Sequence, residues 1–218
     1  MASIILDGSF VRVPISPPLK TKVQITKGNK TDTYILSKNT ERNVFPLQYG
    51  DGSYTVKIYQ SAGRNHYTLI HNQIVTTLNA TECWLEPSFY VWYDDAAKTL
   101  SDKINADNPK QRLSAYFKYC YNSIKDDPIK SFLYKRCSSY LPDIEKTIKK
   151  GKGSSIDRAA VLCALCRING IECKLVVGSV AVRPHAWCQV KVNGYWRTLD
   201  PTYLKQYKIE DYKAEHTY

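Results

Sequence analysis

A serine, a histidine and an aspartate in the last third of the chain have the residue types and spacing for acyl transfer. Ser155 follows the glycine turn G-K-G-S and precedes a run of helical composition that stops at Asn169-Gly170. At a helix N-terminus, free N–H groups and the dipole lower a thiol pKa and stabilise an oxyanion. A plain N-cap serine would occupy the same place. Ser155 by itself therefore fits either a nucleophile position or a cap.

The turn between His185 and Asp200 supports the prediction that these two residues act together. Asn-Gly at 193–194 is a strong signal for a two-residue hairpin turn, and it predicts a register in which Val192 pairs with Tyr195. In that register His185 and Asp200 are diagonal neighbours on one face of adjacent strands, within reach of each other. A carboxylate there can fix the tautomer and orientation of an imidazole, as a general base requires.

These blocks together resemble the transglutaminase-like superfamily of Cys/His/Asp enzymes. They read G-x-S-x-D-x-A-x-x-x-x-A-L-x-R-x-x-G-I, then H-A-W, then L-D-P-T. The sequence is similar above all to a bacterial group, common in clostridia, whose N-terminal β-domain carries the F-P-L-Q-x-G-D-G-S-Y-T-V pattern found here at residues 45–56. The resemblance implies that position 155 is the nucleophile, a cysteine in the family, with His185 as general base and Asp200 as its orienting carboxylate. It also implies a substrate and oxyanion neighbourhood formed by Gly153, Ser154 and Trp187.

Serine at position 155 departs from the family pattern and leaves three interpretations open. The chain is an engineered Cys→Ser form that traps an inactive enzyme, a natural pseudoenzyme, or a serine hydrolase that uses the same His/Asp pair. A hydroxyl is much harder to ionise than a thiol, which argues against the third. Both partner residues are intact, which favours the first over a degenerating pseudoenzyme. We therefore expect this form to bind substrate with little turnover.

The activity that the resemblance implies is that of a thiol enzyme on peptide or protein amide bonds, acting through an acyl-thioester. We expect a cysteine peptidase or amidase rather than a transamidase, because water needs no dedicated amine site. The alternative from another functional class is a non-catalytic protein-binding module with a vestigial cleft. The motifs themselves name no substrate.

The elements that must position these residues form two expected domains in an α+β chain. Residues 1–85 alternate short β-type runs with turns such as Gly50-Asp51-Gly52, which predicts a small immunoglobulin-like β-sandwich for binding or positioning. Residues 86–218 are expected to form the transglutaminase-like (papain-like) domain, with the nucleophile at a helix N-terminus packed on an antiparallel sheet. The tail after Tyr203 is left undecided between the core and a partner.

Helix signals occupy the middle of the chain. One helix is expected near residues 96–104, and a second follows Asn108-Pro109 and ends at Asp126-Asp127-Pro128. A shorter polar helix is expected from Pro142 to Lys150. The apolar stripe predicted for the second helix consists of Leu113, Phe117, Cys120 and Ile124.

The charge is strongly positive, at +11, and residues 101–152 hold 12 Lys and Arg against 6 Asp and Glu. A solvated helical surface explains this excess, and an anionic partner is the alternative; the absence of a nucleic-acid motif argues against nucleic acid. No membrane span or signal peptide is visible, so we expect a cytoplasmic protein, or a secreted one if a leader has been removed.

Seven cysteines in mostly apolar runs suit reduced thiols rather than a disulfide framework. No cofactor or metal is expected, because a C-x-x-C inside a helix lacks the turn of structural zinc sites. Cys163 and Cys188 are poor replacements for a nucleophile at position 155, since each should lie away from it. The possible zinc ligands weighed and set aside are Cys163, Cys166, Cys173, His185 and Cys188.

Overall fold

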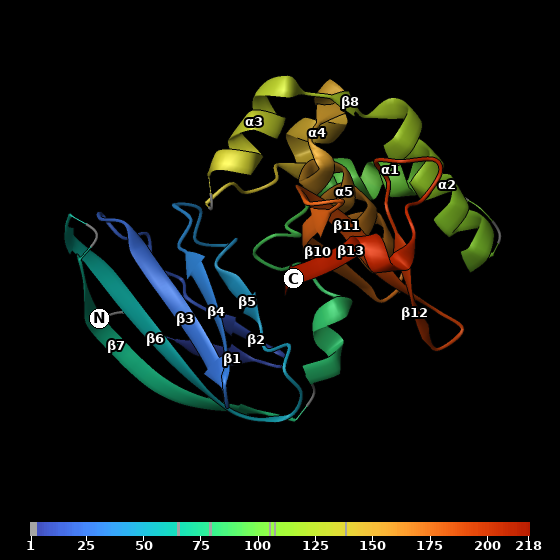
Figure 1. Ribbon diagram of the computed structural model, residues 1–218. Coiled ribbons are helices and arrows are strands. Elements are labelled where there is room, and N and C mark those ends of the chain that lie inside the picture. The colour runs from blue at the N-terminus through green and yellow to red at the C-terminus, as the bar shows by residue number, and fades with distance from the viewer. Residues whose placement is uncertain (1–3, 65, 79, 105, 107, 138) are drawn as a thin grey trace. The chain divides into compact units, whose positions relative to one another are not determined.

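The computed structural model describes residues 4–64, 66–78, 80–104, 106, 108–137 and 139–218. The chain divides into two compact units, one up to Cys83 and one from Trp84 onward, two residues before the expected division after residue 85. Each unit has its own sheets, and the α-helices of the described residues belong to the second (Figure 1). Among the described residues, no helix is long and apolar enough to cross a membrane.

The N-terminal unit consists of two antiparallel sheets with strand orders β1-β2-β5 and β4-β3-β6-β7. Short β-type runs in the sequence overlap six of its strands and miss β5. A 3-10 helix, η1, follows the last strand. The bounds are β1 (Ile5–Asp7), β2 (Phe10–Arg12), β3 (Thr21–Lys27), β4 (Lys30–Ile35), β5 (Val44–Pro46), β6 (Gly52–Gly63), β7 (His66–Thr77) and η1 (Ala80–Trp84).

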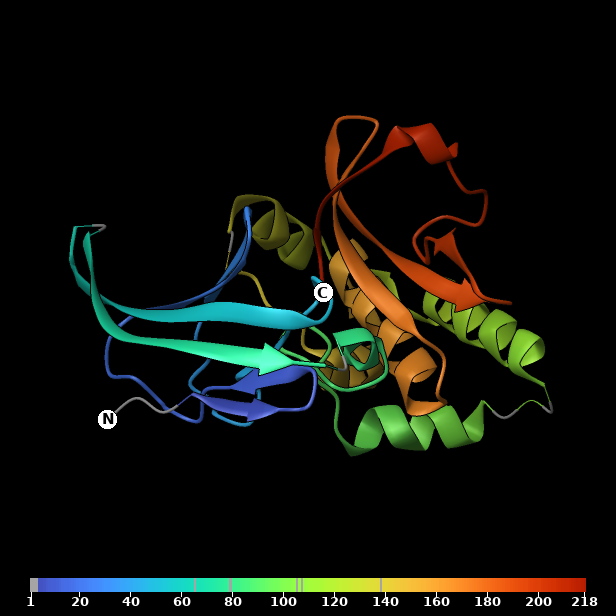
Figure 2. The ribbon, with the colours of Figure 1, turned by 90° about the horizontal axis from the view of Figure 1, so that it is seen from below.

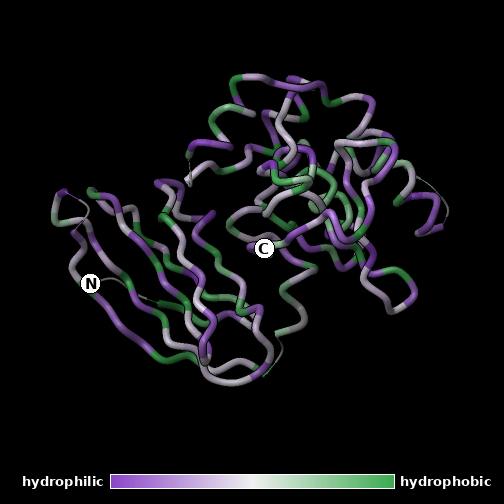
Figure 3. The backbone as a smooth tube through the Cα atoms, viewed as in Figure 1, coloured by the Kyte–Doolittle hydropathy of each residue, from purple (hydrophilic) through white to green (hydrophobic). Residues whose placement is uncertain are grey.

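The core of this unit lies between its two sheets. Val23 of β3 pairs with Ile58 of β6, and both are buried while their neighbours along the strand are more exposed. The ring of Tyr34 in β4 lies 4.7 Å from that of Phe45 in β5, a contact that joins one sheet to the other. Figure 3 shows the matching alternation of hydrophobic and hydrophilic residues along these strands.

The second unit is built around an antiparallel sheet with the order β12-β11-β10-β13. Five α-helices, a short 3-10 helix (η2) and a two-residue parallel pair (β8 and β9) complete the described part. The bounds are α1 (Asp95–Lys103), α2 (Pro109–Ser123), β8 (Lys125–Asp126), α3 (Pro128–Arg136), α4 (Ile144–Lys150), β9 (Lys152–Gly153), α5 (Ser155–Ile168), β10 (Cys173–Val180), β11 (Arg183–Val192), β12 (Tyr195–Leu199), η2 (Ile209–Asp211) and β13 (Tyr212–Thr217).

Helix α5 is the centre of this unit. It contacts β10 and β11 of the sheet as well as α1, α2 and α4 (Figure 2). Every residue from Ile156 to Arg167 is buried, because neighbouring elements surround the helix. Apart from the charged residues Asp157, Arg158 and Arg167, its buried residues are apolar on every side, as such a position requires.

Helices α1, α2 and α4 lie close to their predicted positions, and α3 is missing from the prediction. The Asp127-Pro128 step that stops the preceding segment also begins α3, since the Asp127 carboxylate accepts from the backbone N–H groups of Ile129 and Lys130. The stripe predicted for α2 is partly wrong. Tyr116 and Cys120 are its buried residues, whereas Leu113 and Phe117 are half-exposed because α5 covers α2 along a different line.

The C-terminal tail packs on the sheet, which settles the alternative that the sequence left open. Strand β13 pairs with β10, and the register shifts between Val177 and Gly178. A Cβ at Gly178 would lie 2.0 Å from the carbonyl oxygen of Lys213, so only glycine allows the two backbones to approach this closely. The tail therefore completes the sheet.

Candidate active site

Ser155 is the first residue of α5, as the glycine turn predicts. Ser154 precedes it in an extended conformation and acts as the N-cap. Ser155 is only partly buried, whereas the following twelve residues of the helix are buried. The side chain at position 155 therefore stands where a buried helix reaches an accessible surface, beside the free N–H groups of its first turn.

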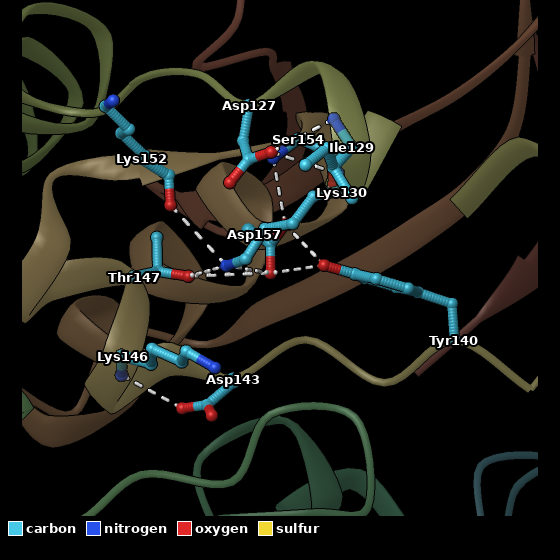
Figure 4. A network of polar contacts seen from close by, with 10 residues as sticks. All are labelled: Asp127, Ile129, Lys130, Tyr140, Asp143, Lys146, Thr147, Lys152, Ser154 and Asp157. Atoms are coloured by element: carbon cyan, nitrogen blue, oxygen red, sulfur yellow. Dashed lines mark hydrogen bonds and ion pairs between the residues drawn. The ribbon is translucent and has the colours of Figure 1, made fainter. Parts of the chain in front are cut away.

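The turn before Ser155 is fixed by the Asp157 carboxylate, which is fully buried. Its Oδ2 accepts from the Ser154 backbone N–H at 2.8 Å and from the Ser154 hydroxyl at 2.7 Å. Figure 4 shows Thr147 and Tyr140 on either side of this carboxylate. The Tyr140 hydroxyl donates at 2.8 Å, and the ammonium of Lys130 lies 3.4 Å from Oδ1. Three segments before the helix thus converge on one carboxylate.

This carboxylate also acts on its phenol partner. Burial and the adjacent negative charge of Asp157 raise the pKa of Tyr140 well above its ordinary value. Tyr140 therefore stays a neutral hydrogen-bond donor. The Lys130 ammonium donates further to the Thr147 hydroxyl at 2.9 Å, which fixes it over the turn.

Gly153 has a packing role in this turn. A Cβ there would lie 2.7 Å from the Cβ of Asp157, so a side chain would displace the carboxylate. Gly153 also belongs to β9, whose parallel pairing with β8 connects the start of α3 to the turn before Ser155. We predicted Gly153 and Ser154 as part of a substrate and oxyanion neighbourhood. In the structure Ser154 is hydrogen-bonded to Asp157, and Gly153 leaves no room for a side chain beside it.

His185 and Asp200 meet as the hairpin register predicts. Val192 pairs with Tyr195, and the ladder continues to Cys188 opposite Leu199. The Nε2 atom of His185 lies 2.8 Å from Oδ2 of Asp200. Asp200 is fully buried and His185 is 6% exposed. Since Nε2 faces the carboxylate, Nδ1 is the nitrogen that remains for other chemistry.

Asp200 is held by groups that the sequence did not indicate. Its Oδ1 accepts from the Thr202 backbone N–H at 2.9 Å, and its Oδ2 accepts from the Tyr212 hydroxyl at 3.2 Å. The amide side chain of Gln206 binds both the backbone N–H and the carbonyl of Asp200. Burial and the Asp200 charge raise the pKa of Tyr212, so this phenol also stays a donor. Tyr212 and Gln206 lie in the tail, which carries no motif that would have identified them.

Ser154, Ser155 and His185 line one cavity of about 490 Å³. Its walls come from the end of β8, the second half of α3, the turn between β10 and β11, and the segment after Asp200. Trp187, which we predicted in the substrate neighbourhood, instead packs in a buried cluster with Val176 and Val180. Its ring is stacked at 6.5 Å from the His185 ring, so it supports the imidazole from within the core.

Comparison with known proteins agrees with this arrangement. The sequence model of the transglutaminase-like superfamily matches residues 98–201, the segment that contains Ser155, His185 and Asp200. Residues 98–201 form a transglutaminase-like core. The superfamily includes both cysteine proteases and transglutaminases.

Among curated proteins, none matches the chain. A TGase crystal structure is 18% identical with a TM-score of 0.41, covering 53% of this chain and 33% of its own. A presumed cysteine protease from Cytophaga hutchinsonii is 18% identical with a TM-score of 0.49, covering 93% of this chain and 66% of its own. The periplasmic domain of TgpA from Pseudomonas aeruginosa is 11% identical with a TM-score of 0.46, covering 85% and 88%. The chain thus spans less than two thirds of the first two proteins.

The cysteines of the second unit are not among the described residues that line the cavity. Cys163, Cys173 and Cys188 come together in the core, with their sulfur atoms within 4.8 Å of one another. Burial raises the pKa of each of these thiols. The Cys188 thiol donates to the carbonyl oxygen of Ala159, and a thiol that donates still carries its proton. His185, the other zinc ligand weighed, is engaged with Asp200, so the arrangement fits packed core thiols better than a metal centre.

Proposed function

We propose that the cavity is the active site of a thiol acyltransfer enzyme that acts on peptide or protein amide bonds. The observation that carries this proposal is the placement of position 155 and His185 in one cavity, with Asp200 hydrogen-bonded behind the imidazole. The roles are nucleophile for position 155, general base and acid for His185, and orienting carboxylate for Asp200. Superfamily membership supports this reaction class.

With a thiol at position 155, the reaction follows from the geometry of these three residues. His185 takes the thiol proton, and the thiolate attacks the carboxamide carbonyl carbon. Backbone N–H groups at the start of α5 stabilise the oxyanion. The imidazolium then gives its proton to the leaving amine, and Asp200 holds the ring in place throughout. The acyl-thioester that remains is cleaved by water, which regenerates the thiol and releases a carboxylic acid.

Hydrolysis is our proposal over transamidation, so the enzyme would be a cysteine peptidase or amidase. Water needs no binding site of its own, whereas transfer to an amine needs a second site that favours the amine over water. The two outcomes share the thioester, and they differ only in what reaches it.

With serine at position 155, the chain is proposed to bind substrate with little turnover. The hydroxyl keeps its proton under conditions where a thiol forms a thiolate–imidazolium pair with histidine. The intact His185–Asp200 pair and its supporting bonds favour a Cys→Ser replacement in an otherwise functional enzyme. A natural pseudoenzyme is the second candidate, and the residue at position 155 in the natural gene distinguishes the two.

The N-terminal unit is proposed to be an immunoglobulin-like binding or positioning domain, with the division near residue 85. Its strand orders match the A-B-E and C′-C-F-G sheets of that fold when the strands are taken in chain order. The Tyr54 hydroxyl donates to the Leu47 carbonyl at 3.0 Å and to the Gly50 carbonyl at 2.7 Å. A tyrosine near the start of strand F that binds backbone upstream is a hallmark of such domains. A non-catalytic protein-binding role for the whole chain remains the alternative function.

Seven free cysteines support a reducing compartment, hence a cytoplasmic location. The proposed partner is a protein or peptide substrate, with the basic segment 101–152 as a further contact for an anionic group. Nucleic acid is not proposed, because no recognition motif accompanies the charge.

The test of the proposed function restores the thiol with Ser155→Cys. Cys137 is the exposed native cysteine, so Cys137→Ser is introduced into every variant to remove background labelling. We expect Ser155→Cys to react with a fluorescent iodoacetamide near neutral pH and to hydrolyse peptide amides. The Ser155 parent should turn over slower by roughly three orders of magnitude or more.

Two controls make this result specific. His185→Ala in the Ser155→Cys background should slow both labelling and hydrolysis, because the thiolate loses its partner. A labelled primary amine added to the assay measures transfer against hydrolysis. A Ser155→Cys protein that is folded but neither labels nor turns over would favour the non-catalytic binding role.

A further inference from the structure

The cavity that contains Ser155 is lined by two cations that lack a carboxylate partner among the described residues. Lys135 lies near the C-terminal end of α3, and Arg183 is the first residue of β11. Neither takes part in an ion pair within the described ranges. Both side chains belong to exposed residues, so they remain available to a ligand.

The carboxylate in the described lining of the cavity does not offset these charges. Asp126 is paired with the Arg158 guanidinium at 2.9 Å. Arg158 is buried, and its other nitrogens donate to the carbonyl oxygen of Ile124, so the guanidinium is fixed against Asp126. This pair is neutral overall. The cavity therefore keeps the positive charge of Lys135 and Arg183.

Aromatic rings cover the part of the cavity next to the imidazole. The Tyr203 ring is stacked on that of His185 at 5.3 Å, and the Tyr207 ring meets Tyr203 edge-on at 5.0 Å. Both tyrosines line the cavity. Flat apolar walls of this kind suit an extended peptide, while the two cations suit carboxylates carried by it.

We propose that this cavity binds an acidic peptide, with a carboxylate close to the reacting amide held between Lys135 and Arg183. This inference rests on the proposed function, because it names the substrate class of the same site. The reacting carboxamide is neutral and needs no cation, so the two charges serve to select the flanking residues. They determine specificity and take no part in the chemical step.

Binding to the Ser155 protein tests the proposal without turnover. The probes are two fluorescent peptides that differ only in Glu or Gln beside a central carboxamide, each with an amidated C-terminus. A third peptide carries Gln and a free C-terminal carboxylate, which separates a side-chain carboxylate from a terminal one. We expect the Glu peptide to bind most tightly, and its advantage to shrink as salt is raised.

Charge-removing variants assign the effect to the two residues. Lys135→Gln or Arg183→Gln should weaken Glu-peptide binding about threefold, and both together about tenfold, as expected for exposed ion pairs. The Gln peptide should bind all forms equally. Lys118→Gln, on an exposed position of α2, is the matched control and should change nothing.

Equal affinity for the Glu and Gln peptides, no measurable binding of either, or tightest binding of the terminal carboxylate would overturn the proposal. The outcome is separable from that of the proposed function. Turnover of both peptides at equal rates by Ser155→Cys would support the enzyme and reject the acidic preference. Preferential binding of the Glu peptide without any turnover by Ser155→Cys would support the acidic subsite and reject the enzyme.

Discussion

Asp200 shows how much of the candidate site is built by residues outside the three-residue motif. Its Oδ2 is hydrogen-bonded to the His185 ring and to the Tyr212 hydroxyl. Its Oδ1 accepts a hydrogen bond from the backbone N–H of Thr202. Donors on both oxygens fix the orientation of this buried carboxylate. The hydrogen bond to Asp200 in turn holds the His185 ring in one orientation, which an acid–base residue needs from its partner.

Tyr212→Phe in the Ser155→Cys background should lower kcat by about threefold to tenfold, with KM unchanged. The variant removes one donor to Asp200 but leaves the ring packed on Trp187, so the fold should lose only about 1 kcal/mol. Steady-state kinetics and urea unfolding measure the two effects. Tyr195→Phe, at an exposed position, is the control. An unchanged kcat would show that Tyr212 does not position the pair.

Asp157→Asn should destabilise the protein by about 3 kcal/mol, because the Lys130 ammonium would lose its buried counter-charge. The amide would also face the Ser154 N–H and hydroxyl with a poorer set of acceptors. Urea unfolding measures the loss. Asp95→Asn on the exposed surface of α1 should stay within about 0.5 kcal/mol of the parent. Equal stability of the two variants would show that Asp157 does not hold the turn.

At the scale of elements, the buried helix α5 and the edge strand β13 place the site. Helix α5 contacts the sheet and three other helices, and these contacts fix the position of its first residue. Strand β13 brings Tyr212 to Asp200 only because Gly178 lets the two backbones approach. The chemistry at the hairpin therefore depends on a glycine in the neighbouring strand.

Gly178→Ala should push β13 away from β10 and cost about 1 to 3 kcal/mol, since the new methyl group would overlap the Lys213 carbonyl. Turnover of the Ser155→Cys form should fall with it, because Tyr212 moves with the strand. Ser179→Ala on the same strand is the control for both measurements. Full stability and activity in Gly178→Ala would mean that the strand pairing tolerates a side chain there.

At the scale of the whole molecule, both units bury tyrosines whose ionisation opposes folding. Burial raises the pKa of Tyr54, in the N-terminal unit, and of Tyr93, in the second unit, to about 12 from 10.0. Above the unfolded pKa the unfolded chain has lost protons that the folded chain keeps, so folding stability falls as pH rises. The stability is fully present below pH 10 and is lost as pH approaches 12.

Unfolding followed by urea at several pH values should therefore show a constant free energy up to about pH 10 and a decline above it. Tyr93→Phe should flatten part of the decline, because one raised group is removed. Tyr195→Phe, which replaces an exposed tyrosine, should leave the slope unchanged. A parent protein whose stability does not change between pH 10 and 12 would contradict this account.

The sequence by itself determined the parts of this protein that depend on local pattern. The glycine turn placed Ser155 at the start of a helix, and Asn-Gly at 193–194 set the hairpin register that joins His185 to Asp200. Both follow from short-range rules about turns and alternation. Helix α3 was not predicted by these rules, because a single Asp-Pro step both ends one segment and begins the next.

The tertiary structure decided what depends on residues far apart in the chain. The tail forms a sheet strand that brings Tyr212 to Asp200. Trp187 packs in the buried core and is not among the described residues that line the cavity. Lys130 and Tyr140 reached Asp157 from separate segments. None of these contacts leaves a periodic trace in the sequence, because each is fixed by how helices and strands pack in space and not by neighbouring residues.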